Sequence, residues 1–123
     1  MTERVDRLRE SLEEPLLVTT GVNVRYLVGF QSSNAALLVD DEHVLLFTDF
    51  RYAEAARAVE GVEFVQTHRS VYTTIADRLD GRLGFEASSL AYANWQLLND
   101  AGLELVPRTP PKGFQLSELD GVN

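Results

Sequence analysis

Apolar residues recur along the chain at spacings that distinguish helices from strands. Val5, Leu8 and Leu12 stand three and four positions apart, which places them on one face of a helix that Pro15 is expected to end. The apolar run in PLLVTT, residues 15–20, has the length of a short strand. The chain is therefore predicted to begin with a helix that leads directly into a strand.

The strongest strand signals lie in the next thirty or so positions. The segment NVRYLVGF is too short for a secure strand and predicts one helical turn that Gly29 terminates, because glycine readily adopts the left-handed conformation found after a helix. Two nearly continuous apolar runs follow, NAALLVD and HVLLFTD, and only a short acidic turn separates them. This pattern predicts a β-hairpin whose two faces are both covered.

The second half of the chain alternates between helix and strand patterns. We expect three helices there, with N-terminal caps at Asp49, at Ser70, and at Ser88 or Ser89. The three strand patterns that alternate with them are VEFVQT, RLGFE and LELVP. A hairpin followed by alternation predicts an α/β fold with a mixed β-sheet flanked by helices, an order found in RNase-H-like topology.

The character of the sequence changes after this alternating region. Residues 1–107 are interpreted as one domain, because a chain of this length suits a single core. Residues 108–123, RTPPKGFQLSELDGVN, contain two prolines and two glycines and show little periodicity. That composition is typical of a C-terminal tail or of the start of a linker to an absent domain.

Charge and composition exclude several classes of function. Eleven Lys and Arg stand against 19 Asp and Glu, and the net charge of −8 predicts no nucleic-acid partner, because such binding depends on cations that neutralise phosphates. Cysteine is absent, which excludes a disulfide framework, a thiolate metal site and a cysteine nucleophile. No apolar run approaches the roughly 20 residues of a membrane span, so no membrane partner is expected. We expect a cytoplasmic location.

The remaining polar residues form no complete catalytic constellation. His43 and His68 have no metal-ligating neighbour at helical spacing. Ser32 and Ser33 lie in a loop without the G-x-S-x-G pattern of an activated serine, so we expect them to form turn hydrogen bonds. The residues alone indicate an acidic α/β domain that serves binding or assembly.

Three carboxylates, those of Asp40, Asp49 and Glu86, are predicted at strand ends. Nucleases of RNase-H-like topology hold metal ions with such carboxylates, but Asp49 already has a role as a helix cap, and the net charge opposes a nucleic-acid substrate. Tyr92 and Trp95, on an amphipathic helix, are expected in the core, and an exposed Trp95 would instead indicate an interface.

Four phrases of the sequence resemble, in order and spacing, the N-terminal domain of the proline-specific metallopeptidases. That family comprises the Xaa-Pro aminopeptidases and the Xaa-Pro dipeptidases (prolidases), and it is related to creatinase. The resemblance covers about residues 3–107, and the phrases that carry it are RVDRLRESL, LLVTTGVNVRYLVGFQSSNAALLV, VLLFTDFRYAEAA and LGFEASSLAYANWQLL. The combination of NVRYLVGF, an apolar strand and FTDFRY is the most specific part.

The resemblance implies a two-domain parent protein. Its N-terminal part would be a non-catalytic RNase-H-like α/β domain, and its C-terminal part a pita-bread domain that binds two divalent metals, manganese or cobalt, and hydrolyses X-Pro bonds. None of those metal ligands is carried over to this chain, so we expect no cofactor and no hydrolysis by this chain alone. The implied partners are its own C-terminal catalytic domain, a second subunit in a homodimer, and short X-Pro peptides.

The resemblance also implies a set of candidate site residues. In the family this domain contributes to oligomerisation and restricts access to the active site, and the loop that matches VNVRYLVGFQSSNA approaches the neighbouring subunit's site. The positions carried over as lining residues are Asn23, Arg25, Phe30, Ser32 and Ser33. Some relatives have an acidic residue in this loop, whereas Asn23 offers hydrogen bonding. Arg51 and Tyr52 are expected to be structural, with Arg51 paired to Asp49.

Two alternatives remain open from the sequence. A creatinase-like amidinohydrolase has the same architecture, and its N-terminal domain differs little from that of a peptidase. A stand-alone binding or assembly module would have this fold alone. The sequence downstream of Asn123 would separate a stand-alone module from a peptidase, because a peptidase would continue into the domain that carries the metal ligands.

Overall fold

A computed structural model describes residues 2–68 and 70–108, and it confirms a mixed sheet flanked by helices. In chain order the elements are α1 (Thr2–Arg9), β1 (Leu16–Val18), α2 (Gly21–Val28), β2 (Ala35–Val39), β3 (Val44–Asp49), the 3₁₀ helix η1 (Phe50–Tyr52), α3 (Ala53–Arg57), β4 (Glu63–Thr67), α4 (Val71–Arg78), β5 (Arg82–Glu86), α5 (Tyr92–Asp100) and β6 (Glu104–Arg108). Among the described helices, none has the length and apolarity that a bilayer span requires.

The described strands form one six-stranded sheet in the order β4-β3-β2-β1-β5-β6. β2 is antiparallel to both β1 and β3, and the other neighbouring pairs are parallel. All strands except β2 therefore run in the same direction, and their C-terminal ends lie along one edge. We call this edge, with the segments 19–22, 50–52 and 86–92 and the loop 29–34 that leads into β2, the carboxyl edge.

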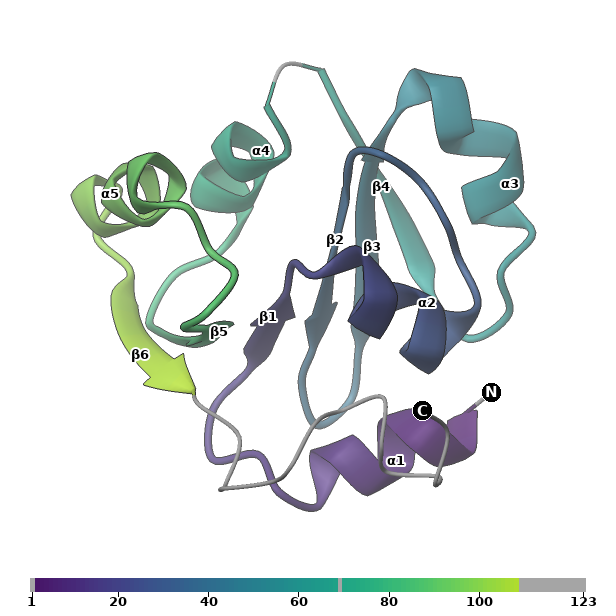
Figure 1. Ribbon diagram of the computed structural model, residues 1–123, viewed down its shortest axis with the longest axis horizontal. Coiled ribbons are helices and arrows are strands. Elements are labelled where there is room, and N and C mark those ends of the chain that lie inside the picture. The colour runs from purple at the N-terminus through teal and green to yellow at the C-terminus, as the bar shows by residue number, and fades with distance from the viewer. Residues whose placement is uncertain (1, 69, 109–123) are drawn as a thin grey trace.

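Helices cover the two faces of the sheet in two groups (Figure 1). One core cluster joins α1, α2 and α3 to the sheet through residues such as Leu8, Leu27 and Leu46. The other joins α4 and α5 to the opposite face and includes Phe47 and Ile75, both fully buried. The predicted hairpin of β2 and β3 is confirmed, and both of its faces are covered because nearly every position is apolar.

The helices of the first half differ in length from the sequence prediction. α1 ends at Arg9, well before Pro15, because the chain then tightens into three-residue turns, with Ser11 N–H donating to the Leu8 carbonyl at 3.0 Å. α2 has eight residues where one turn was predicted, since its inner face packs into the core. Gly29 ends α2 as predicted, with φ at +76° in the left-handed region.

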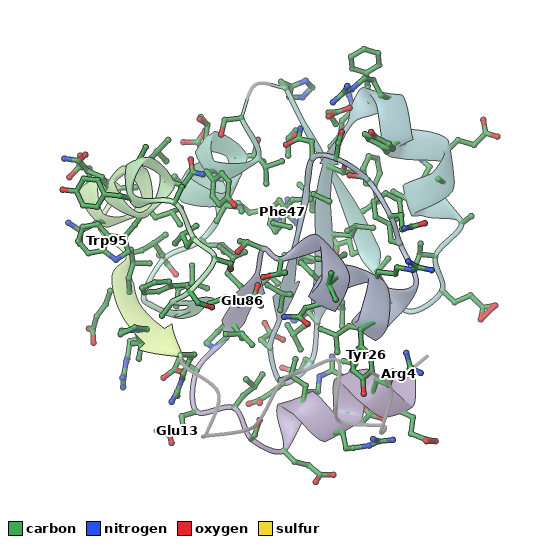
Figure 2. All side chains as sticks on the ribbon, viewed as in Figure 1. Arg4, Glu13, Tyr26, Phe47, Glu86 and Trp95 are labelled. Carbon is green, nitrogen blue, oxygen red and sulfur yellow. The ribbon has the colours of Figure 1, made fainter. Side chains whose placement is uncertain are left out.

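A cation joins the first two helices. Arg4 Nη1 donates to the Tyr26 carbonyl at 2.8 Å, and its guanidinium carbon lies 4.3 Å from the centre of the Tyr26 ring (Figure 2). Tyr26 is 7% exposed, so its ring packs in the interior. The contact fixes α1 against α2, the helix that carries two of the candidate site residues.

Two of the predicted helix caps are confirmed and one is wrong. The Asp49 carboxylate accepts from Arg51 N–H at the start of η1, and Ser70 Oγ accepts from Tyr72 N–H at the start of α4. Neither Ser88 nor Ser89 caps α5: its N-cap is Ala91, which offers no side-chain hydrogen bond. Ser89 lies in a turn before the helix, and its hydroxyl faces another strand end.

The aromatic pair on α5 is also more exposed than predicted. Tyr92 is 71% exposed, and Trp95 is only partly buried on the outer side of the helix (Figure 2). Their rings stack on one another with centroids 6.0 Å apart. The helix contributes Leu98, rather than its aromatic residues, to the fully buried core.

Two phenylalanines three positions apart provide a direct test of this core. Phe47→Ala should lower the free energy of unfolding by about 3–5 kcal/mol, because it opens a cavity at a fully buried position. Phe50→Ala, the matched control, should change it by less than about 0.5 kcal/mol, because Phe50 is 73% exposed. Urea unfolding followed by circular dichroism measures both values. Equal losses would show that Phe47 is not the core residue described here.

Candidate functional site

Glu86, at the end of β5, gathers the start of α2 at the carboxyl edge. Its Oε1 accepts from the backbone N–H of Thr19 at 2.5 Å and of Thr20 at 2.8 Å, and its Oε2 accepts from Asn23 Nδ2 at 2.6 Å. Figure 2 shows Glu86 beside the connection from β1 to α2. One carboxylate thus binds three donors of a segment more than sixty residues earlier in the chain.

The Glu86 carboxylate serves as the missing cap of α2. Thr20 is the N-cap residue of that helix, but its own side chain makes no capping hydrogen bond. The N-terminus of a helix attracts negative charge because its first N–H groups lack acceptors. The parallel pairing of β1 with β5 brings Glu86 to that position, so the cap comes from a neighbouring strand.

Hydroxyl groups surround this carboxylate. Thr19 Oγ1 lies 3.4 Å from Glu86 Oε1 and 3.1 Å from Ser89 Oγ. Tyr72 of α4 lies near the same group, and burial raises the pKa of its hydroxyl, with the Glu86 charge acting in the same direction. We call Thr19, Thr20, Asn23, Glu86 and Ser89 the Glu86 network.

A second carboxylate organises the end of β3. Arg51 forms a two-pronged pair with Asp49, through Nε to Oδ1 and Nη2 to Oδ2, both at 2.9 Å, as predicted. Asn34 Nδ2 donates to Asp49 Oδ2 at 2.7 Å. The Arg51 side chain, then the Asn34 amide, hold the pKa of the Asp49 carboxyl well below its usual range.

The loop that enters β2 is attached to the same strand end. Ser33 Oγ lies 2.9 Å from the Tyr52 hydroxyl, and its N–H donates to the same oxygen at 3.4 Å. These two hydrogen bonds lower the pKa of the Tyr52 hydroxyl. Phe30 packs edge-on against the Tyr52 ring, and Ser32 Oγ accepts from Asn34 N–H at 2.9 Å, which confirms the predicted turn bond.

Several exposed side chains lie on the segments that Glu86 and Asp49 hold in place. The side chain of Val22 is 64% exposed and that of Phe50 is 73% exposed. Arg25 lies one helical turn after Val22 and is exposed, and within residues 2–68 and 70–108 its guanidinium has no hydrogen-bond or ion-pair partner. We call Val22, Arg25, Phe50 and Arg51 the exposed residues of the carboxyl edge.

The sequence of this chain matches a known domain family. The family model described as "Creatinase/Prolidase N-terminal domain" matches residues 4–111. The chain belongs to this family. A relative from Bacillus subtilis (strain 168), "Uncharacterized peptidase YqhT", is 36% identical over 101 residues, which cover 75% of this chain and 28% of that protein.

Solved Creatinase/Prolidase N-terminal domains have the same fold. One from a putative metallopeptidase of Corynebacterium diphtheriae is 30% identical, with a TM-score of 0.77 over 89% of this chain and 96% of that one. The N-terminal domain of the cytoplasmic peptidase PepQ from Mycobacterium tuberculosis H37Rv is 33% identical, with a TM-score of 0.76 over 87% and 93%. An Xaa-Pro dipeptidase from Bacillus anthracis is 25% identical, with a TM-score of 0.79 over 88% of this chain and 33% of that one. The present chain therefore spans about a third or less of its longer relatives.

The structure separates the five candidate residues of this Creatinase/Prolidase domain. Asn23 lies in the Glu86 network, Ser33 contacts Tyr52, and Ser32 forms a turn. Phe30 is 4% exposed, and its side chain packs in the core and anchors the loop 29–34 there. Arg25 alone projects freely into solvent, and the role of all five at an entrance stays a prediction.

Glu86, Asn34 and Tyr52 are organising residues that sequence reasoning undervalued. The sequence pattern suggests only a metal-binding role for Glu86, although its place at a strand end is the signal of a carboxylate that can accept hydrogen bonds from the start of a helix. Its partners follow β1, a strand whose pairing with β5 the pattern does not reveal. Within the described residues, no group of three or more His, Asp or Glu side chains is arranged to hold a metal ion.

Exchanging donor and acceptor between residues 23 and 86 tests the Glu86 network. Asn23→Asp should lower the free energy of unfolding by about 1–2 kcal/mol, because two carboxylates then face each other. Adding Glu86→Gln should restore most of this loss, since the new amide can donate to the new carboxylate. Glu86→Gln alone should cost less, because the Asn23 amide can turn to present its oxygen.

A matched control for this exchange exists on α5. Asn94 occupies the same third position after its N-cap Ala91 as Asn23 does after Thr20, and among the described residues no carboxylate is hydrogen-bonded to it. Asn94→Asp should be neutral or slightly stabilising, because a negative charge suits the first turn. Urea unfolding of the wild type, Asn23→Asp, Glu86→Gln, the double variant and the Asn94→Asp control provides the measurement. A double variant no more stable than Asn23→Asp would contradict the network.

The Asp49 pair predicts a loss of stability in acid. Its folded-state pKa lies below the unfolded value of 3.8, so its contribution is present at neutral pH and disappears as pH falls below about 4. The difference in unfolding free energy between the wild type and Asp49→Asn should therefore stay constant from pH 7 to 5 and shrink below pH 4. Urea titrations at several pH values measure it. A difference that grows in acid would refute the pairing.

Proposed function

We propose that this chain is the non-catalytic N-terminal domain of a proline-specific metallopeptidase, an Xaa-Pro dipeptidase or aminopeptidase. In this proposal it contributes to oligomerisation and restricts access to the active site that hydrolyses X-Pro bonds. Support comes from the family membership and from relatives described as Xaa-Pro dipeptidase and Xaa-Pro aminopeptidase. A cytoplasmic location is part of the proposal, and the description of the M. tuberculosis relative supports it.

The observation that carries the proposal is the set of exposed residues of the carboxyl edge. Val22 and Phe50 leave apolar surface in water, and covering that surface would favour contact with another domain or subunit. The segments that bear them are held rigidly by the Glu86 network and the Asp49–Arg51 pair. A rigid edge with exposed apolar groups is suited to narrowing an entrance, because it loses little conformational entropy on contact.

The chemistry itself is assigned to the C-terminal domain of the parent protein. The described residues do not fit a metal centre, because they lack a suitable cluster of ligands. The proposal therefore places the two divalent metals, manganese or cobalt, outside them, where they would activate water for attack on the X-Pro carbonyl. The partners are that catalytic domain, a second subunit in a homodimer, and short X-Pro peptides.

The test uses the native protein that contains this chain. Phe50→Ala should relax the selection for short substrates, because it removes a side chain at the proposed entrance. The value of kcat/KM for an X-Pro peptide of eight residues should therefore rise several-fold relative to the value for an X-Pro dipeptide. Tyr92→Ala, an equally exposed aromatic position on α5, is the matched control and should leave the ratio unchanged. Light scattering on the same proteins reports any loss of dimer.

The assay needs a second control with this chain alone. With manganese it should release no proline from an X-Pro dipeptide, and chelator-sensitive hydrolysis by the pure chain would overturn the assignment of chemistry to another domain. If the Phe50→Ala protein matches the wild type in both the kcat/KM ratio and the oligomeric state, the carboxyl edge does not line the entrance.

A further inference from the structure

Arg25 of α2 is an arginine without a partner in an acidic chain. The chain has 19 Asp and Glu against 11 Lys and Arg, so acceptors for a guanidinium are abundant. Arg25 is exposed, and no acceptor or aromatic ring within the part of the chain that the structure describes contacts its guanidinium. Every other arginine of residues 2–68 and 70–108 contacts a carboxylate, a carbonyl oxygen or an aromatic ring, namely Arg4, Arg7, Arg9, Arg51, Arg57, Arg78, Arg82 and Arg108.

The backbone that carries Arg25 is fixed at both ends of α2. Glu86 holds the two N–H groups that lead into the helix, and Gly29 N–H donates to the Arg25 carbonyl at 2.8 Å. The residues on either side, Val24 and Tyr26, are 2% and 7% exposed, so this part of the helix cannot turn without exposing the core. The guanidinium thus extends from a fixed point, and binding through it costs little more than the conformational entropy of one side chain.

Val22 lies beside Arg25 on the same face of α2. The two residues are three positions apart, which is a spacing at which helical side chains are neighbours. Val22 is 64% exposed, so its methyl groups offer an apolar surface next to the guanidinium. A guanidinium can donate two parallel N–H bonds to one carboxylate. The two side chains together therefore suit a ligand that carries a carboxylate next to an apolar group.

A free C-terminal proline has this chemistry, because its carboxylate and its pyrrolidine ring share one carbon atom. We propose that Arg25 is a specificity-determining residue that binds the free C-terminal carboxylate of an X-Pro dipeptide, with Val22 against the prolyl ring. The inference rests on the proposed function, and it adds which end of the substrate this edge recognises. Neither residue takes part in the cleavage of the peptide bond.

The test compares two substrates of the native protein that contains this chain, an X-Pro dipeptide and its C-terminal amide. Arg25→Gln should lower kcat/KM for the free acid about tenfold, because a charge-assisted hydrogen bond to the carboxylate is lost. It should change kcat/KM for the amide by less than about twofold, since the amide carries no negative charge. The loss should appear in KM, because the contact is made equally in the ground state and in the transition state.

Three further variants separate this role from a structural one. A cation in the last turn also stabilises a helix, and Arg25→Lys keeps that charge but cannot form two parallel bonds, so it should restore only part of the lost activity. Val22→Ser should lower kcat/KM for both substrates alike, because both carry the prolyl ring. Arg57→Gln is the matched control: it removes an exposed arginine of α3, which lies over the Phe64 ring, and should leave the ratio of the two values unchanged.

The outcomes distinguish this inference from the proposed function. A ratio of free-acid to amide kcat/KM that Arg25→Gln leaves unchanged, or that Arg57→Gln lowers equally, would overturn the role of Arg25 and leave the peptidase function in place. A wild-type protein that cleaves the amide as well as the free acid would do the same. A native protein that cleaves neither substrate would overturn the peptidase function and this inference with it.

Discussion

The three hydrogen bonds that the Glu86 carboxylate accepts hold together two parts of the chain that the sequence keeps far apart. They satisfy the backbone N–H groups of Thr19 and Thr20, which lead into α2, and they bind the Asn23 side chain in its first turn. The position of α2 in turn sets the packing of Val24, Leu27 and Val28 in one of the two cores. Without this carboxylate, the helix would begin with unpaired donors at a partly buried site, which is costly.

Carboxylates recur at this edge for a physical reason. The sheet is apolar on both faces, so polar groups that need partners are concentrated where strands end. Asp49 satisfies the start of η1 and binds both Arg51 and Asn34, while Glu86 satisfies the start of α2. The loops of the carboxyl edge are therefore tied to strands, and their exposed residues keep a fixed position relative to the core.

Local signals in the sequence predicted much of this fold. The hairpin, the caps at Asp49 and Ser70 and the end of α2 at Gly29 each depend on neighbouring residues, and all are confirmed. The cap at Ser88 or Ser89 was wrong because these residues belong to a turn at the strand end, and the end of α1 was misplaced because its last turns tighten before Pro15.

The site was harder to predict than the fold. Asn23 was identified as a site residue, but its partner Glu86 lies sixty-three positions away on a parallel strand. No periodicity reveals which strands pair, so a network across β1 and β5 needs the topology first. Phe30 illustrates the opposite error, since a position carried over by resemblance is 4% exposed and supports the loop rather than faces solvent.

The proposal that links these findings is that the carboxyl edge would be the surface this domain presents to the rest of a parent protein. Hydrogen–deuterium exchange measures it directly, by comparing the isolated chain with the same residues in the native protein that contains it. The account predicts slower exchange in residues 22–33 and 50–52 of the native protein, and unchanged exchange in residues 92–100 of α5. Slower exchange confined to α4 and α5, with residues 22–33 and 50–52 unaffected, would contradict it.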